Sequence, residues 1–416
     1  MTSIAAAYPV RRRPRGADRR DRAEREQVPR EAWTRLAACT GAAALLQIDG
    51  TLITVALPSV ARGLHMSAAS TSLVLSTYFA AYALLLLPGG ALVDRVGPRR
   101  IGMLGLGLFA FGVAAGALAP GTGVLLAARL IQGAGAGLVS PAALAGAVSG
   151  FPLERRGAAL GIWGASAGMA NLIGPLLGGV LTIALGWRAN WWALLPLAVI
   201  ASRTISVHLP GSIPRETGGK HQQPARDPVV RAATLIAALS FGVMVSCLYL
   251  AEQYLQRAAG YSALGASSVL VFVALLVGAA APVAGRIADR RGDRLPAVVG
   301  IIASGSGLAV LGLPGVPLHS AVAIAPLIPV GLGLGMLFVP TSRAALNAIS
   351  DAAHGRTSAL LSAGRLLGAA AGAGLAGMAL SGGASATAVH AALLTAGVAC
   401  VAVGLPASTR LGRAGG

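Results

Sequence analysis

Long runs of apolar residues dominate the chain, and polar residues gather in the short stretches between them. Twelve runs have roughly the 20 residues that an α-helix needs to cross a bilayer. Nothing in them alternates like a barrel strand, and lipid offers the backbone no partner, so each run predicts a helix. The runs lie near residues 36–60, 70–93, 101–119, 123–150, 157–183, 190–207, 231–256, 264–285, 296–314, 320–341, 357–380 and 386–406.

The basic residues predict the orientation of these helices. Twenty-eight of the 33 lie on the side that carries both termini, three lie on the opposite side, and Arg129 and Arg365 lie within runs. Because Lys and Arg accumulate on the cytoplasmic side of membrane proteins, we expect a multi-pass protein of the inner (cytoplasmic) membrane with both termini in the cytoplasm. Residues 1–35 would form a basic tail and residues 407–416 a short second tail.

An internal repeat divides the chain into two halves. The pattern Gly90-x-x-x-Asp94-Arg95-x-Gly97-x-Arg99 recurs 195 residues later, beginning at Gly285 and including Asp289 and Arg290. A stretch rich in Pro and Gly at 208–230 separates the sixth run from the seventh, as a cytoplasmic linker would. We therefore expect an all-α membrane protein with two pseudo-symmetric six-helix bundles, at 36–207 and 231–406.

Composition narrows the class of protein further. Only 11% of the residues are charged and the mean hydropathy is +0.72, whereas a soluble domain is usually about a quarter charged. The net charge of +19 raises the question of nucleic acid, but the positive residues sit in short tracts between neutral runs and form no basic face, so we expect no nucleic-acid partner. The three cysteines lie in apolar runs without the spacing of a metal site or a disulfide framework.

Four motifs, in order along the chain, resemble those of the major facilitator superfamily. Gly90-Ala-Leu-Val-Asp94-Arg95-Val-Gly97-Pro-Arg99 resembles its loop between helices two and three, and Arg129-Leu-Ile-Gln132-Gly133 its fourth-helix motif. Gly161 with Gly174-Pro175-Leu-Leu-Gly178-Gly179 resembles the fifth-helix motif of its antiporters. The stretch from Asp49 to Pro58 is similar to the first-helix motif of the drug:proton antiporters that usually have fourteen helices, whereas this chain has twelve runs.

The resemblance implies a twelve-helix major facilitator fold that exports hydrophobic or amphipathic small molecules, such as drugs or natural products, against proton entry. An uptake permease for a small metabolite keeps the same fold and reverses the direction of transport. A membrane sensor or a lipid-modifying enzyme is the alternative of another class, but an enzyme would need a catalytic constellation at one membrane face, and the sequence offers none. We expect a monomer that is not an enzyme and needs no cofactor or metal.

Two charged residues are the main candidates for proton coupling. Asp49 lies about 20 Å into the first run, at 1.5 Å per residue. A carboxylate at that depth should face a wet cavity, have a partner, or be protonated. Arg129 lies in the fourth run, and the family resemblance links it to proton transfer. Each could instead be structural, Asp49 as a hydrogen-bonded carboxyl group and Arg129 as a hub for backbone carbonyls.

The seventh run supplies a further acid and most of the expected cavity. Glu252 lies near the outer end of that run, where a role in coupling and a simple interfacial position are equally plausible. Tyr249, Gln253 and Gln256 lie about one turn apart on the same run, and with Asp49 and Asn171 we expect them to line the substrate cavity.

The remaining candidates concern gating. Glycines at four-residue spacing in the fifth run let helices approach closely, and Pro175 permits a bend, so Gly161, Gly174, Gly178 and Gly179 predict a tight seam that controls opening. The loop residues Asp94, Arg95 and Arg99, with Gly90, Gly97 and their repeats Asp289 and Arg290, predict a cytoplasmic latch of charge pairs between helix ends.

Overall fold

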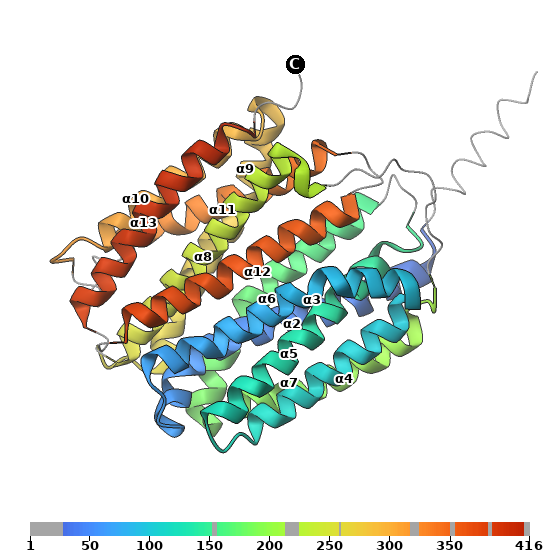
Figure 1. The fold of residues 1–416 in the computed structure, drawn as a ribbon, viewed down its shortest axis with the longest axis horizontal. Coiled ribbons are helices and arrows are strands. Elements are labelled where there is room, and N and C mark those ends of the chain that lie inside the picture. Colours follow the sequence, from blue (N-terminus) through green and yellow to red (C-terminus); the bar gives the residue numbers. More distant parts are fainter. Residues whose placement is uncertain are drawn as a thin grey trace, which may run out of the picture.

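The fold is a bundle of long helices packed side by side (Figure 1). The computed structural model describes residues 28–151, 156–212, 224–257, 259–316, 324–349, 354–381 and 385–411. Within these residues twelve helices of 18 to 34 residues account for nearly all of the ordered backbone, together with one short 3-10 turn, η2, at Pro224–Arg226.

The helices match the predicted runs in order and number. Ten of them are long and apolar enough to cross a membrane. The other two of the twelve helices, α6 and α7, have 30 and 20 residues. The first half contains α2 (Arg30–Gly63), α3 (Ala68–Val96), α4 (Pro98–Ala117), α5 (Thr122–Val148), α6 (Arg156–Leu185) and α7 (Ala189–His208). The second contains α8 (Pro228–Arg257), α9 (Ala263–Arg291), α10 (Arg294–Leu311), α11 (Ile324–Asn347), α12 (His354–Ala379) and α13 (Ala386–Ser408).

The first helix begins six residues earlier than expected, at Arg30 instead of residue 36. Tertiary contacts hold this extra turn and a half, which the run of apolar residues does not reveal. Arg35 donates hydrogen bonds to the carbonyl oxygen of His208 at 3.1 Å and to Ser149, and Trp33 packs edge-on against Phe151. Part of the predicted N-terminal tail is therefore helix, and what precedes residue 28 lies outside the described residues.

The internal repeat is visible in the turns as well as in the sequence. Ser67 and Ser262, 195 residues apart, each cap the following helix by accepting a hydrogen bond from a backbone N–H three residues on. Gly97 and Gly292 end α3 and α9 with φ of 100° and 79°, a conformation that glycine adopts without steric cost. The two halves thus share their helix boundaries down to single capping residues.

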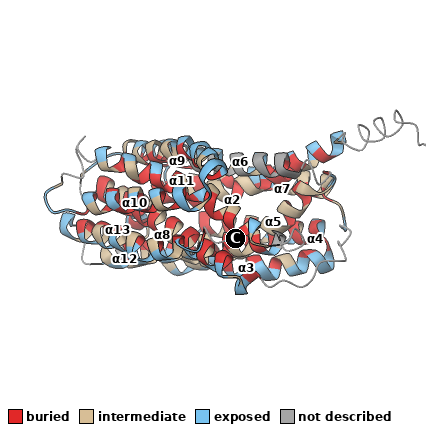
Figure 2. Cartoon of the chain, turned by 90° about the horizontal axis from the view of Figure 1, so that it is seen from above, coloured by how far each residue is buried: buried red, intermediate tan, exposed pale blue. Residues whose placement is uncertain are grey.

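Close packing within each half uses glycine. A Cβ at Gly105 would lie 2.7 Å from the carbonyl oxygen of Gly135, and a Cβ at Gly300 would lie 2.7 Å from that of Gly333, so α4–α5 and α10–α11 cross at matching glycine contacts. Buried residues face the helix–helix contacts, and exposed ones lie on the outer faces and at the helix ends (Figure 2). Many exposed residues are large and apolar, as expected for a surface in contact with lipid.

Candidate functional site

A buried ion pair lies inside the first half. Nη1 of Arg129, on α5, donates to both carboxylate oxygens of Asp49, on α2, at 2.8 and 3.0 Å. Both side chains are 0% exposed. Of the three surroundings expected for Asp49, the structure shows the partner: the two leading candidates for proton coupling, 80 residues apart, are bound to each other.

A shell of polar and aromatic groups fixes the pair. Nε of Arg129 donates to the carbonyl oxygen of Val74 at 3.0 Å, and its guanidinium lies 4.2 Å from the centre of the Tyr78 ring. The amide of Gln132 donates to Asp49 at 3.3 Å and accepts from Arg129 at 3.3 Å and from the indole of Trp191 at 3.4 Å. Nη2 of Arg129 is buried and has no hydrogen-bond partner among the described residues.

Sequence reasoning did not single out Tyr78, Gln132 or Trp191 as members of this site. Gln132 carried a signal, because it follows Arg129 by three residues and so lies on the same helix face. Tyr78 and Trp191 come from α3 and α7, and only the packing brings them in. Gly133 makes that packing possible, because a Cβ there would lie 2.9 Å from Ala81 of α3.

A second carboxylate lies between the halves. Glu252, on α8, is 0% exposed, and its Oε1 accepts a hydrogen bond from Gln256. The same amide donates to the carbonyl oxygen of Val55, on α2, at 3.0 Å. Among the described residues, Oε2 of Glu252 and both amide atoms of Gln253 are buried without a partner. Glu252 is therefore not at a water interface: it is enclosed where α8 meets α2.

The other expected cavity residues have different surroundings. Tyr249 and Gln253 are 1% and 0% exposed, so both are enclosed in this conformation. Asn171 lies in α6, but its side chain is outside the described residues. No group of three or more His, Cys, Asp or Glu side chains that could hold a metal ion occurs in the described part of the chain.

The glycines of α6 face two different neighbours. A Cβ at Gly178 would lie 2.5 Å from the carbonyl oxygen of Leu52, and one at Gly174 would overlap Thr51, so both glycines lie against α2 of the same half. A Cβ at Gly179 would instead lie 2.7 Å from Oγ of Ser267 and 3.3 Å from Cα of Leu264, on α9 of the other half. Pro175 and Gly161 both lie within the helix, and the surroundings of Gly161 are outside the described residues.

Two of the specific contacts between the halves lie toward the ends of the helices that are remote from the linker. They are the approach of Gly179 to α9 and the hydrogen bond from Gln256 to Val55. A third joins α3 to α12, where the hydroxyl of Ser76 donates to the carbonyl oxygen of Ala370 at 2.9 Å, again in the half of each helix away from the linker. The halves are thus joined at the end of the bundle opposite to the linker.

The charged loops at the linker end differ between the halves. Asp289 and Asp293, at the α9–α10 turn, both pair with Arg343 of α11; the Asp293 contact is 2.9 Å. Burial raises the pKa of Asp293, and the Arg343 guanidinium partly offsets this. In the first half, no described residue forms an ion pair with Asp94, Arg95 or Arg99, and a Cβ at Gly97 would overlap the carbonyl oxygen of Gly211. The expected latch of charge pairs is present only at Asp289; Arg290 has no such pair among the described residues.

Arg365, on α12, lies well inside the second half without a carboxylate partner among the described residues. Its guanidinium stacks 4.1 Å from the centre of the Phe338 ring and 5.7 Å from that of Phe241, and it donates to Oγ of Ser342 at 2.7 Å. Stacking on aromatic rings, and not pairing with an acid, is how this arginine is held.

Comparison with known proteins identifies the kind of helical bundle. The sequence profile of the Major Facilitator Superfamily matches residues 39–373 and 237–412. The fold is similar to a bacterial homolog of the human lysosomal transporter Spinster, with a TM-score of 0.72 at 18% identity, covering 90% of this chain and 95% of the other.

Among curated sequences, the chain is 38% identical over 198 residues to the puromycin resistance protein of Streptomyces alboniger, which covers 44% of this chain and 39% of that one. It is 39% identical over 171 residues to an uncharacterized MFS-type transporter of Mycobacterium tuberculosis, and this match covers 41% of this chain and 30% of that one. A multidrug resistance protein of the same organism is 25% identical over 407 residues, which cover 82% of this chain and 75% of that one. The first two matches span between about a third and two fifths of the relatives' length.

Proposed function

This chain belongs to the Major Facilitator Superfamily, and from that premise we propose that it is a proton-coupled exporter of hydrophobic or amphipathic small molecules. Relatives named for resistance to puromycin and to multiple drugs support export. The observation that carries the coupling is the Asp49–Arg129 pair, a fully buried carboxylate and guanidinium inside a transporter of this family.

Coupling requires a site whose protonation changes the energy of one arrangement of the helices relative to the other. Protonation of Asp49 neutralises the carboxylate that pairs with Arg129, while the hydrogen bonds of Arg129 to Val74 and Gln132 remain. The contact between α2 and α5 is then weakened at one point, and α2 also carries Thr51 and Leu52 against the α6 glycines. Protonation of Asp49 would therefore weaken the packing of α2, which carries Asp49 and also contacts the α6 glycines.

Both groups of the pair are sealed from water in this conformation, so proton exchange belongs to a different stage of the cycle. We infer that the present arrangement is closed toward the outside, because the contacts at Ser76, Gln256 and Gly179 lie away from the linker. Alternating access would break these contacts and join the halves at the linker end.

Glu252 is the second carboxylate in this scheme. It lies at the contact that would open toward the outside, and among the described residues one of its carboxylate oxygens and both amide atoms of the next residue, Gln253, are buried without a partner. Buried polar atoms of this kind need water, an ion or a ligand in some state of the protein. We propose that Glu252, Gln253, Gln256 and Tyr249, and Asn171 of α6, meet water or substrate when the outer contact opens.

The topology follows the same reasoning. From the distribution of Lys and Arg we infer a protein of the cytoplasmic membrane with both termini and the 208–230 linker in the cytoplasm, and we propose that it acts as a monomer. Reporter fusions at Gly218 and Gly416 should both give a cytoplasmic signal. A periplasmic signal at either position would contradict this topology.

The function is tested by transport in proteoliposomes with an imposed pH gradient, using ethidium and puromycin as probes. The parent protein should move a probe opposite to the proton gradient, and Asp49→Asn, which keeps the shape and removes the titration, should abolish this uphill movement while retaining probe binding. Asp227→Asn is the matched control: Asp227 accepts hydrogen bonds from Val229 and Val230 at the start of α8, and asparagine also caps helices well.

Three outcomes contradict parts of the proposal. Uphill pumping by Asp49→Asn at the parental rate would make Asp49 structural and leave Glu252 as the next candidate. Probe movement in the same direction as the protons would favour the uptake permease. No gradient-driven movement by the parent, despite probe binding, would remove proton coupling altogether.

A further inference from the structure

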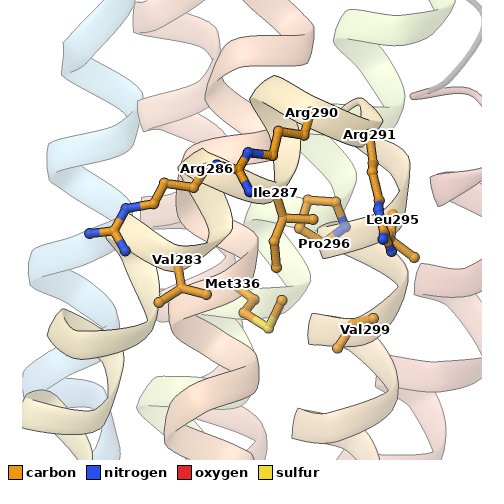
Figure 3. Close-up of a pocket in the computed structure, with 9 residues that line it drawn as sticks. All are labelled: Val283, Arg286, Ile287, Arg290, Arg291, Leu295, Pro296, Val299 and Met336. Carbon is orange, nitrogen blue, oxygen red and sulfur yellow. The ribbon is translucent and has the colours of Figure 1, made fainter.

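A pocket lies at the turn between α9 and α10, outside the proposed transport machinery. Figure 3 shows Arg286, Arg290 and Arg291 toward the turn, with the apolar side chains of Val283, Val299 and Met336 further along the helices. Ile287, Leu295 and Pro296 complete the lining, and the hollow measures about 480 Å³. It is therefore a cavity with a cationic end and an apolar wall.

The arginines of this pocket are free to bind an anion. The nearby acids, Asp289 and Asp293, are both paired with Arg343 on α11. No described residue forms an ion pair with Arg286, Arg290 or Arg291. A guanidinium group with free donors matches the oxygens of a phosphate, because one arginine can donate two parallel hydrogen bonds to it, and the three arginines lie around the cationic end of the pocket (Figure 3).

The sequence repeat shows that these charges are not a general feature of the loop. Arg290 corresponds to Arg95, but Arg286 and Arg291 correspond, 195 residues earlier, to Ala91 and Val96. The second half has thus added two arginines to a turn whose capping glycine and aspartate it shares with the first half. Membrane orientation alone needs only positive charge somewhere in the loop, and does not account for a hollow between the added arginines.

The apolar wall identifies the source of the phosphate. Val283 is 45% and Val299 41% exposed, and both lie on helices long and apolar enough to cross the bilayer. A free phosphate would have no use for such a wall, whereas a lipid presents an acyl chain directly beside its phosphodiester. We propose that this pocket binds an anionic phospholipid, with the phosphate at Arg286, Arg290 and Arg291 and an acyl chain along Val283, Val299 and Met336.

Native mass spectrometry of the purified full chain tests this site independently of transport. The chain is titrated with cardiolipin, with phosphatidylcholine of the same acyl chains, and with inorganic phosphate. The parent should retain cardiolipin in preference to phosphatidylcholine, and inorganic phosphate should not displace it. The double variant Arg286→Gln/Arg291→Gln should lose affinity for cardiolipin roughly thirtyfold, at the usual contribution of each arginine near a membrane surface.

Arg99→Gln/Arg100→Gln removes the same charge from the corresponding turn of the first half, and should change cardiolipin binding much less. Val299→Trp is the second variant. It fills the space beside the apolar wall and keeps every arginine, so it should also weaken cardiolipin binding. Equal retention of both lipids by the parent, equal losses in the two double variants, or full binding by Val299→Trp would each overturn the site. Displacement by inorganic phosphate would show an anion site that does not recognise lipid.

Discussion

The two halves of the bundle each have six helices and share the capping residues of two turns, but they hold their charged residues in different places. The first half has Arg129 paired with Asp49 in its interior, with both side chains fully buried. In the second half, Gly331 contacts α9 as Gly133 contacts α3, and this register places Leu327 where the first half has Arg129 and Val330 where it has Gln132. Val273 takes the place of Tyr78.

In the second half, the ion pairs among the described residues lie at the linker end, and a further arginine, Arg365, lies inside the half. Arg343 holds two aspartates at the α9–α10 turn, whereas Asp94 at the α3–α4 turn has no ion-pair partner among the described residues. Arg365 is stacked on aromatic rings, and no acid among the described residues pairs with it. The same arrangement of helices therefore carries an acid–base pair in one half and apolar residues at the corresponding positions of the other.

We propose from this difference that the two halves have separate tasks. The buried pair of the first half has no titratable counterpart at Leu327, Val330 or Val273 of the second half, which would leave proton exchange in the first half to Asp49. The second half then contributes the carboxylate and amides of α8 to the contact between the halves. The comparison predicts that changes in the first-half pair affect coupling most and that changes in the second-half loop affect it least.

The largest effect should come from making the first half resemble the second. Arg129→Leu copies Leu327 and leaves Asp49 buried without its cationic partner, with only the weaker hydrogen bond from Gln132, which should cost about 3–5 kcal/mol of stability. Adding Asp49→Asn removes the uncompensated charge and should restore most of that loss, but not gradient-driven export. Thermal unfolding of the single and double variants in detergent, with transport in proteoliposomes, measures both effects. Export by the double variant at the parental rate would show that the pair has no part in coupling.

The α6 glycines should give the next largest effect. Leu at Gly178 meets the backbone of Leu52, which cannot move aside, so Gly178→Leu should cost about 1–3 kcal/mol and reduce export while the protein still reaches the membrane. Gly179→Leu meets the side chain of Ser267 and presses on the contact between the halves, so it should cost less stability for a similar loss of export. Gly107→Leu, with nothing within 4 Å, is the control. Normal export by Gly178→Leu would refute the seam.

These comparisons also show what the sequence can and cannot predict. The twelve helices follow from the thickness of the bilayer, which fixes the length of each apolar run, and the repeat follows from matching residues. Asp49 and Arg129 each stood out as charges in apolar runs. Their contact depends on how α2 packs against α5, and the roles of Tyr78 and Trp191 depend on how α3 and α7 pack beside that pair. Neighbouring glycines look alike in sequence, yet Gly178 and Gly179 face different halves. The early start of α2 depends on Arg35 reaching His208.

A smaller effect is expected at Arg365. Its removal leaves no buried carboxylate behind, and the lost interaction is mainly stacking on Phe338, so Arg365→Gln should cost at most about 2 kcal/mol, less than Arg129→Leu. Arg365→Lys keeps the charge and should recover part of that difference. Thermal unfolding of the three variants under the same conditions gives the ranking. A loss at Arg365→Gln as large as at Arg129→Leu would show that an acid pairs with this arginine after all.

The smallest effect should come from the loops at the linker end, and it should be confined to the second half. Arg343 is 31% exposed, Asp289 68% and Asp293 10%, and exposed ion pairs are worth about 1 kcal/mol or less. Arg343→Gln keeps an amide donor for the less exposed Asp293, so it should lower stability only slightly, and added salt should reduce the difference from the parent because exposed pairs are screened. Asp94→Asn in the first half should change stability even less, because no described residue pairs with it. Unfolding of both variants at low and high salt makes the comparison. A salt-sensitive loss at Asp94→Asn that equals the loss at Arg343→Gln would mean that the first-half loop also forms a charge pair, in the arrangement where the linker ends of the two halves meet.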